Sequence, residues 1–240
     1  MSPEELLDLL ESLVDPAGLE EAARVGITSR KAYGIKVPVL RKIARETGRD
    51  HWIALELWES GILDARQLAC MIDDPRLVTA EQMESWAADF DSWALTDGAC
   101  YGLFGQTPFA YSKAFEWSDR PEEFVKRGAF AMIAGLAVHD KGAPDERFLE
   151  FLPVIERQAD DERNFVKKAV NWALRGIGKR NMRLNRSGID TAKSIKARGA
   201  SPAARWTAAD ALRELTGEKV QARLRQKEND GGSKGNRDSH

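Results

Sequence analysis

A tryptophan set among cations is the feature of this sequence that most clearly suggests chemistry. At 100° per residue, four residues fall on one side of a helix, opposite its narrow apolar stripe; they are Lys168, Trp172, Arg175 and Lys179. Such a set suits stacking of the ring on a sugar or base while the cations hold phosphates. Burial of the ring under a neighbouring helix is the alternative, because tryptophan is mostly buried.

The charge pattern around this cluster points the same way. Residues 1–120 hold 12 Lys and Arg against 21 Asp and Glu, whereas residues 121–240 hold 24 against 17. Within residues 163–198 there are 11 basic residues and a single acid, Asp190. A solvated charged face would explain the run, but an excess of this size favours a site for a polyanion.

Trp93 and Asp97 form a second candidate pair. They stand four positions apart, so a helix would carry the ring and the carboxylate on one face. The other side of the same helix would hold apolar residues, namely Leu95, Ala99 and Leu103. From spacing alone, a core tryptophan beside a solvated aspartate is the simpler interpretation.

Lys126 and Arg127 interrupt a segment, 121–138, that is apolar almost all round. Such a segment is expected to be an inner helix packed on several sides. Arginine rarely enters these surroundings without a carboxylate or phosphate partner. A buried ion pair is the simpler of those two explanations.

The elements that position these residues are predicted to be helices throughout. Ser2-Pro3-Glu4-Glu5 is a capping box that begins the first helix. Further helices are expected near 17–25, 38–47, 51–59, 64–73, 79–89, 92–104, 108–117, 121–138, 145–158, 162–178, 187–197 and 202–214. Short helices joined by tight turns indicate an all-α solenoid of HEAT-like repeats, antiparallel helix pairs of roughly 35 to 45 residues. A compact orthogonal bundle is the alternative.

Length and composition limit the remaining possibilities. We expect one domain over residues 1–225 and a polar, disordered tail over 226–240. The start MSPEELLDLL lacks the apolar run of a signal peptide, so a cytoplasmic protein is expected. Two cysteines and three histidines cannot be assembled into a metal-ligand spacing, and no phosphate loop or Ser/His/Asp set is present. No metal or other cofactor is therefore expected.

Taken together, these segments resemble the AlkD-like DNA alkylation repair family. The matching stretches run in order from near the start of the chain to about residue 215, and are YGIKVPVLR at 33–41, Ser92-Trp93 through Asp97, FVKR at 124–127, HDK at 139–141, NFVKKAVNWALR at 164–175 and GKRN at 178–181. Each motif alone is moderately specific, but their order and spacing make the resemblance strong. The chain departs from the pattern at Ala94, Thr96 and Phe124.

The resemblance implies a right-handed HEAT-like solenoid and a set of site residues. The family's catalytic-helix motif falls on Trp93 and Asp97, its cleft arginine on Arg127 and its second cleft tryptophan on Trp172. We expect the neighbouring cations to contact the DNA backbone, namely Lys126, Lys168, Arg175, Lys179 and Arg180.

The implied activity is excision of cationic N3- and N7-alkylated purines from double-stranded DNA by a monomer, associated with the nucleoid when bound to DNA. Asp97 would stabilise the oxocarbenium-like sugar, and no tight base pocket is needed. Two alternatives stay open. One is a non-catalytic protein that binds DNA or senses damage, and the other is a protein-interaction scaffold.

Overall fold

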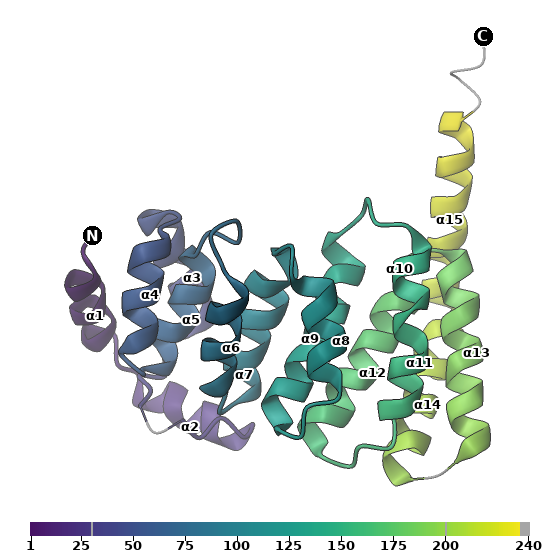
Figure 1. Ribbon diagram of the computed structural model, residues 1–240, viewed down its shortest axis with the longest axis horizontal. Coiled ribbons are helices and arrows are strands. Elements are labelled where there is room, and N and C mark those ends of the chain that lie inside the picture. The colour runs from purple at the N-terminus through teal and green to yellow at the C-terminus, as the bar shows by residue number, and fades with distance from the viewer. Residues whose placement is uncertain (30, 200, 236–240) are drawn as a thin grey trace. The chain divides into compact units, whose positions relative to one another are not determined.

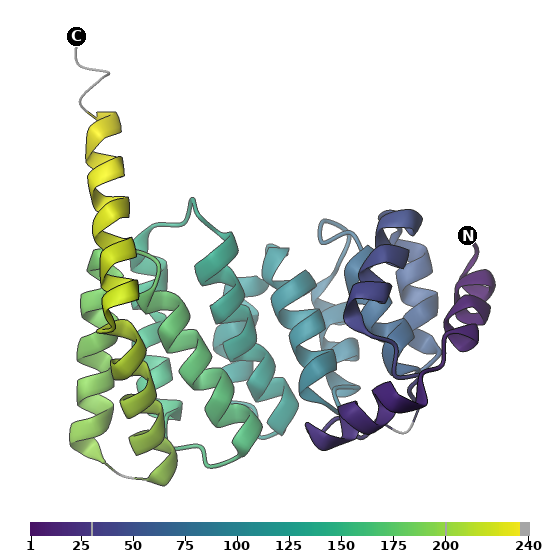
Figure 2. The ribbon, with the colours of Figure 1, turned by 180° about the vertical axis from the view of Figure 1, so that it is seen from behind.

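The computed structural model describes residues 1–29, 31–199 and 201–235 (Figures 1 and 2). Within these ranges the chain is helical and contains no strand. It divides into two compact units, 1–113 and 114–240. The prediction of a single domain over 1–225 stays a prediction.

The first unit begins with the predicted capping box. The Glu5 amide donates to Ser2 Oγ at 3.2 Å, and the Ser2 amide donates to Glu5 Oε2 at 2.7 Å, which confirms that expectation. The helices of this unit are α1 (Pro3–Ser12), α2 (Pro16–Arg24), α3 (Val37–Thr47), α4 (His51–Glu59), α5 (Leu63–Ile72), α6 (Ala80–Ala88) and α7 (Trp93–Asp97). A π-helix (Gly98–Leu103) and a 3₁₀ turn (Phe104–Gln106) follow, and the division between the units falls within α8 (Ala110–Ser118).

The helices of the second unit are α9 (Glu123–His139), α10 (Asp145–Leu149), α11 (Phe151–Gln158), α12 (Asn164–Gly178), α13 (Met182–Arg198), α14 (Pro202–Leu215) and α15 (Glu218–Gly235). The predicted helix 145–158 is broken at Glu150, and α13 begins five residues before the predicted start. In Figures 1 and 2, α15 packs by its first turns against α13 and α14 and then runs beyond them. The predicted tail therefore begins inside a helix, and residues 236–240 lie outside the described residues.

The core of the first unit contains two stacked tryptophans. The rings of Trp58 on α4 and Trp86 on α6 lie 3.9 Å apart, almost parallel. Trp58 Nε1 donates to Asp89 Oδ2 at 2.8 Å, and Arg66 bonds the same oxygen while its guanidinium lies 5.0 Å from the Trp58 ring. The buried ring therefore has a partner for its only polar atom, as buried tryptophans usually do.

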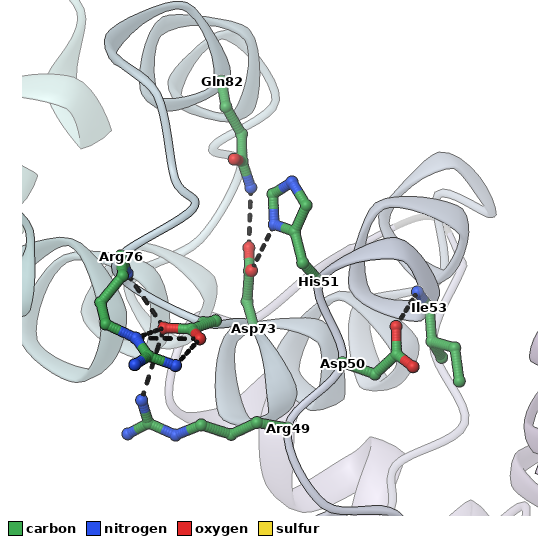
Figure 3. A network of polar contacts seen from close by, with 8 residues as sticks. Arg49, Asp50, His51, Ile53, Asp73, Arg76 and Gln82 are labelled. Carbon is green, nitrogen blue, oxygen red and sulfur yellow. Dashed lines mark hydrogen bonds and ion pairs between the residues drawn. The ribbon is translucent and has the colours of Figure 1, made fainter.

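A polar network holds the start of α4 to the loop after α5 (Figure 3). The Asp73 carboxylate is fully buried and bonds His51 Nδ1 at 2.7 Å and Gln82 Nε2 at 2.8 Å. The hydrogen bonds from Arg76 hold the pKa of the neighbouring Asp74 at about 2, and Arg49 lies 3.8 Å away on the same carboxylate. The two aspartates that follow α5 are therefore held by side chains from α4, from α6 and from the loops beside them.

Two helices, α9 and α12, form the centre of the second unit and pack against each other along their lengths (Figure 1). Residues 125–137 of α9 are all buried, which confirms the prediction of an inner helix. Gly178, at the end of α12, lets α14 come close: a Cβ there would lie 2.7 Å from Leu215 Cδ1. The last turn of α12 thus packs closely against the end of α14.

Two classes of feature are not found. No helix in the described ranges is long and apolar enough to cross a membrane. Over the same residues, the acidic, histidine and cysteine side chains form no group of three that could hold a metal ion.

Candidate functional site

In the first unit, Trp93 and Asp97 lie at the two ends of the short helix α7, and both side chains are half-buried. Trp93 Nε1 donates at 3.0 Å to the carbonyl of Val25, which directly follows the last residue of α2. The opposite side of the segment is buried as predicted, with Leu95, Ala99 and Leu103 in the core. Trp93 and Asp97 are thus both half-buried on one short helix, whose inner side packs in the core.

Asp97 also marks a change of helix type, which the sequence pattern did not predict. The expected single helix 92–104 is wrong: α7 ends at Asp97, and the chain continues as a π-helix from Gly98. Single turns of π-helix inside α-helices are frequent at functional sites. Gly98 and Gly102 stand in this segment, but glycine alone does not predict a π-helix.

Thr96 is one of the positions at which the chain departs from the family pattern, and its side chain points into the protein. Its side chain is buried, and Oγ1 donates to the carbonyl of Ser92 at 2.9 Å, one turn earlier. Ser92 is itself buried and its hydroxyl has no hydrogen-bond partner. The departure at Thr96 therefore lies on the packing side of α7, whereas Asp97 is half-buried.

The motif at 33–38 is held by a residue that sequence reasoning missed. Asp64, buried at the start of α5, accepts hydrogen bonds from the Tyr33 amide at 2.6 Å and the Ile35 amide at 2.8 Å. Between them Gly34 has φ +75°, where a Cβ would meet the backbone of Leu19 at 2.6 Å. A glycine and a buried carboxylate thus fix the turn that leads into α3.

In the second unit, Lys126 and Arg127 are both buried on α9. Lys126 Nζ forms an ion pair with Asp161 Oδ2 at 3.5 Å and donates to Gln158 Oε1 at 3.0 Å. Arg127 Nη1 donates to the carbonyl of Phe165 at 2.7 Å, on the first turn of α12. Lys126 thus has the internal carboxylate partner that the simpler interpretation called for, and its contact with DNA stays a prediction.

Trp172 is half-buried on α12, and Lys168 stands one turn before it on the same face. Lys168 is exposed and has no ion pair or hydrogen bond to any residue that the structure describes. The contact of this exposed lysine with the DNA backbone stays a prediction.

The other cations near Trp172 face a neighbouring helix instead. Arg175 forms ion pairs with Glu214 and, at 3.6 Å, with Asp210, while Lys179 Nζ lies 2.6 Å from Glu214 Oε1. Burial acts to raise the pKa of Glu214, but the hydrogen bonds from Lys179 and Arg175 together outweigh it and leave the pKa below its ordinary value. Two of the three predicted phosphate ligands on this helix are thus neutralised by α14.

These contacts belong to a polar stripe of α12 that lies against α14. Its members are spaced by four residues and are Lys167, Asn171, Arg175 and Lys179. Lys167 Nζ lies 5.2 Å from the centre of the Trp206 ring, and Asn171 Nδ2 donates to the Thr207 carbonyl at 3.1 Å. The predicted basic face therefore divides into a packed stripe and an outer side that carries Lys168 and Trp172.

Arg180 anchors backbone within the second unit. Its guanidinium donates to the carbonyls of Ala137 at 3.3 Å and Ala143 at 2.9 Å, and lies 4.2 Å from the Phe148 ring. The three contacts tie the end of α9, the following loop and α10 to the turn after α12. The prediction that Arg180 contacts DNA is not tested by this arrangement, but the residue has a structural role of its own.

The sequence is similar to a known protein family and to one curated protein. A family model described as "DNA alkylation repair enzyme" matches residues 6–215. An uncharacterized protein of Listeria innocua, Lin0241, is 25% identical over 166 residues, which cover 68% of this chain and 72% of that protein.

A solved structure shares the fold. It is described as "a new family of proteins related to the HEAT-like repeat DNA glycosylases with affinity for branched DNA structures". The likeness covers 93% of this chain and 96% of that one, with a TM-score of 0.77 and 17% sequence identity. The prediction of HEAT-like repeats built from antiparallel helix pairs is thereby confirmed.

Proposed function

The chain belongs to the DNA alkylation repair enzyme family, and on that premise we propose that it is a DNA glycosylase that excises positively charged N3- and N7-alkylated purines from duplex DNA. One observation carries the proposal. Trp93 and Asp97 are presented together, half-buried, on a short helix whose inner side and tryptophan Nε1 are fixed by other parts of the same unit.

In this reaction the main task of the protein is to stabilise the positive charge that develops on the sugar. An alkylated purine with a formal positive charge leaves with the electron pair of the N-glycosidic bond and becomes neutral, so no acid need protonate it. The deoxyribose left behind has the character of an oxocarbenium ion, and water adds to its anomeric carbon and gives up a proton. A carboxylate beside that carbon stabilises the cation and orients the water.

We assign this role to Asp97. Asp97 is half-buried at the end of α7, and α7 itself is held by buried neighbours. A preorganised charge of this kind acts on the transition state without a reorganisation cost.

Trp93 and Trp172 are assigned to the sugar of the lesion. The negative face of an indole ring attracts partial positive charge, which develops on the deoxyribose as the base leaves. Arg127, which donates to the Phe165 carbonyl within the second unit, is assigned to a phosphate beside the lesion.

Lys168 is the cation that fits best as a ligand of the DNA backbone, because it is exposed and stands one turn from Trp172. The internal partners of Lys126, Arg175, Lys179 and Arg180 must be exchanged, at least in part, before these residues can bind a phosphate. We therefore rank Lys168 first among the proposed backbone ligands.

A base-release assay tests the proposal. A duplex that contains 7-methylguanine is incubated with the wild type, with Asp97→Asn and with Asp91→Asn, and free base is measured over time. Asp91 is a matched control because it is exposed and lies just before α7. We expect release by the wild type and by Asp91→Asn, and a rate lower by about 100-fold or more for Asp97→Asn. Absence of free base above background, or an Asp97→Asn rate equal to the wild type, would overturn it.

A second candidate function is DNA binding without excision. It is favoured by the solved relative, which is described as having affinity for branched DNA structures and as related to the glycosylases. This function predicts salt-dependent binding of DNA with no base release by any variant.

A further inference from the structure

Trp206 differs from most tryptophans of this chain by its exposure. Trp58, Trp86 and Trp117 are buried, whereas Trp206 on α14 is 41% exposed. Among the exposed large apolar residues, the other tryptophan is Trp52, at 74%. An exposed indole ring is costly to keep in water and suits stacking on another flat ring.

One cation, Lys167, lies against the Trp206 ring, and two further cations stand next to this pair in the sequence. Lys167 Nζ lies 5.2 Å from the ring centre, and the side chains of Lys168 and Arg205 next to these two residues are exposed. By contrast, Trp52 stands in the acidic half of the sequence, beside His51. The surroundings of Trp206 therefore match an aromatic ligand that carries negative charge.

The patch formed by Lys167, Lys168, Arg205 and Trp206 is held in place by the packing of α12 on α14. One turn after Lys167, the buried Asn171 donates to the Thr207 carbonyl at 3.1 Å and fixes the two helices at this level. Lys168 belongs both to the patch and to the face of Trp172.

We propose that this patch binds an unpaired nucleotide of DNA, with the base stacked on Trp206 and the adjoining phosphates on Lys167 and Lys168. An aromatic ring flanked by cations is the usual surface for single strands, because every base has a flat face and every nucleotide a phosphate. In an intact duplex both faces of a base are covered by its neighbours. The patch should therefore select DNA with overhangs, gaps or branches.

This proposal shares DNA as a ligand with the proposed glycosylase but does not use Asp97. The two can fail separately, because base release is measured on an intact duplex and the patch is measured by binding to DNA with unpaired nucleotides.

Fluorescence anisotropy tests the proposal with two labelled probes of equal duplex length, one blunt and one with a single-stranded overhang. The variants are Trp206→Ala, Trp206→Tyr and, as a matched control, Trp52→Ala. We expect Trp206→Ala to weaken binding of the overhang probe by about 10-fold, within the range seen when a stacking ring is removed. Trp206→Tyr should retain most of the affinity, and Trp52→Ala all of it. Binding of the blunt probe should change by less than about twofold in every variant.

Three results would overturn the proposal. The first is equal binding of the two probes by the wild type, and the second is unchanged overhang binding by Trp206→Ala. The third is an equal loss on both probes, which would mean that Trp206 only ties α14 to α12 through Lys167. If Trp206→Ala does not fold, Lys167→Ala provides the test: it should weaken binding of the overhang probe, lower the salt dependence of that binding and change binding of the blunt probe by less than about twofold. Unchanged overhang binding by Lys167→Ala would then overturn the proposal.

Discussion

The two units fix their backbones with side chains of opposite charge. In the first unit the Asp64 carboxylate accepts two backbone amides in the turn before α3, at 2.6 and 2.8 Å. In the second the Arg180 guanidinium donates to two backbone carbonyls around the end of α9, at 3.3 and 2.9 Å. Each charged side chain thus supplies hydrogen bonds to backbone groups next to a helix end or a turn, where regular helical hydrogen bonds are incomplete.

The comparison changes how the charge asymmetry of the sequence is understood. Part of the acidic excess of the first half is buried as Asp64 and Asp73, and much of the basic run in the second half is paired with acids of neighbouring helices. A count along the sequence therefore overestimates the positive surface. Lys168 belongs to the remainder that is exposed.

Asp64→Ala is the substitution from which we expect the largest effect on stability. It leaves two backbone amides of the turn at 33–35 without an acceptor, and hydrogen bonds to charged groups are worth about 1.5–3 kcal/mol each. We expect the free energy of unfolding to fall by about 3 kcal/mol, measured by chemical denaturation. Asp8→Ala, on the exposed side of α1, is the control and should change it by less than about 0.5 kcal/mol. An equal loss of unfolding free energy in Asp64→Ala and Asp8→Ala would contradict the structural role given to Asp64.

Arg180→Ala tests the other half of the comparison. It removes two hydrogen bonds to backbone and the contact with the Phe148 ring, so we expect a loss of about 2 kcal/mol in unfolding free energy. The exposed Arg186 provides a control with the same loss of charge. A stable Arg180→Ala protein with weakened DNA binding would show instead that Arg180 serves DNA, as the sequence predicted.

Glu214→Gln tests whether α14 masks the cations of α12. Because Glu214 pairs with Arg175 and Lys179, its neutralisation should free both for phosphate. We expect affinity for duplex DNA at low salt to rise by about 3- to 10-fold, with a steeper salt dependence, by roughly one to two released counterions. Glu218→Gln makes the same change of charge at an exposed position of α15 and should raise affinity by less than about twofold. Unchanged affinity of Glu214→Gln would mean that Arg175 and Lys179 do not reach DNA.

The same variant has a predicted pH dependence. Since the pKa of folded Glu214 lies below its ordinary value of 4.5, its ion pairs stabilise the fold above that pH and lose their effect as the pH falls through the folded pKa. The wild type should therefore be more stable than Glu214→Gln near pH 7, and the difference should shrink below about pH 4. A difference that persists in acid would assign the effect to packing.

Lys168→Ala is expected to have the smallest effect. Loss of one exposed, unpaired cation should weaken duplex binding by about threefold and lower the salt slope by about one, with no loss of stability. Lys196→Ala, equally exposed on α13, is the control. If the two variants weaken binding equally, the face of Trp172 has no special part in binding.

Sequence reasoning predicted those features that depend on local pattern. The capping box at Ser2, the inner helix α9 and the shared helix of Trp93 and Asp97 follow from spacing of three or four residues, and all are present. The break of the predicted helix at Asp97 does not follow from such a pattern, because a π-helix depends on how the segment packs.

The contacts between residues far apart in the sequence could not be predicted, for a different reason. Arg175 and Glu214 are 39 residues apart, and Asp64 is 31 residues from Tyr33, so only the tertiary fold brings them together. One signal was present in the sequence. Arg175 and Lys179 stand four residues apart, as do Asp210 and Glu214, and two helices with such complementary pairs can pack face to face.

The central claim is that Asp97 stabilises a sugar cation during loss of a charged purine. It is tested most directly by the single-turnover rate of 7-methylguanine release from duplex DNA, with wild type and Asp97→Asn both saturating the same substrate. We predict that Asp97→Asn binds the duplex as tightly as the wild type and releases the base at least about 100-fold more slowly. Equal rates at equal occupancy would contradict the assignment of Asp97.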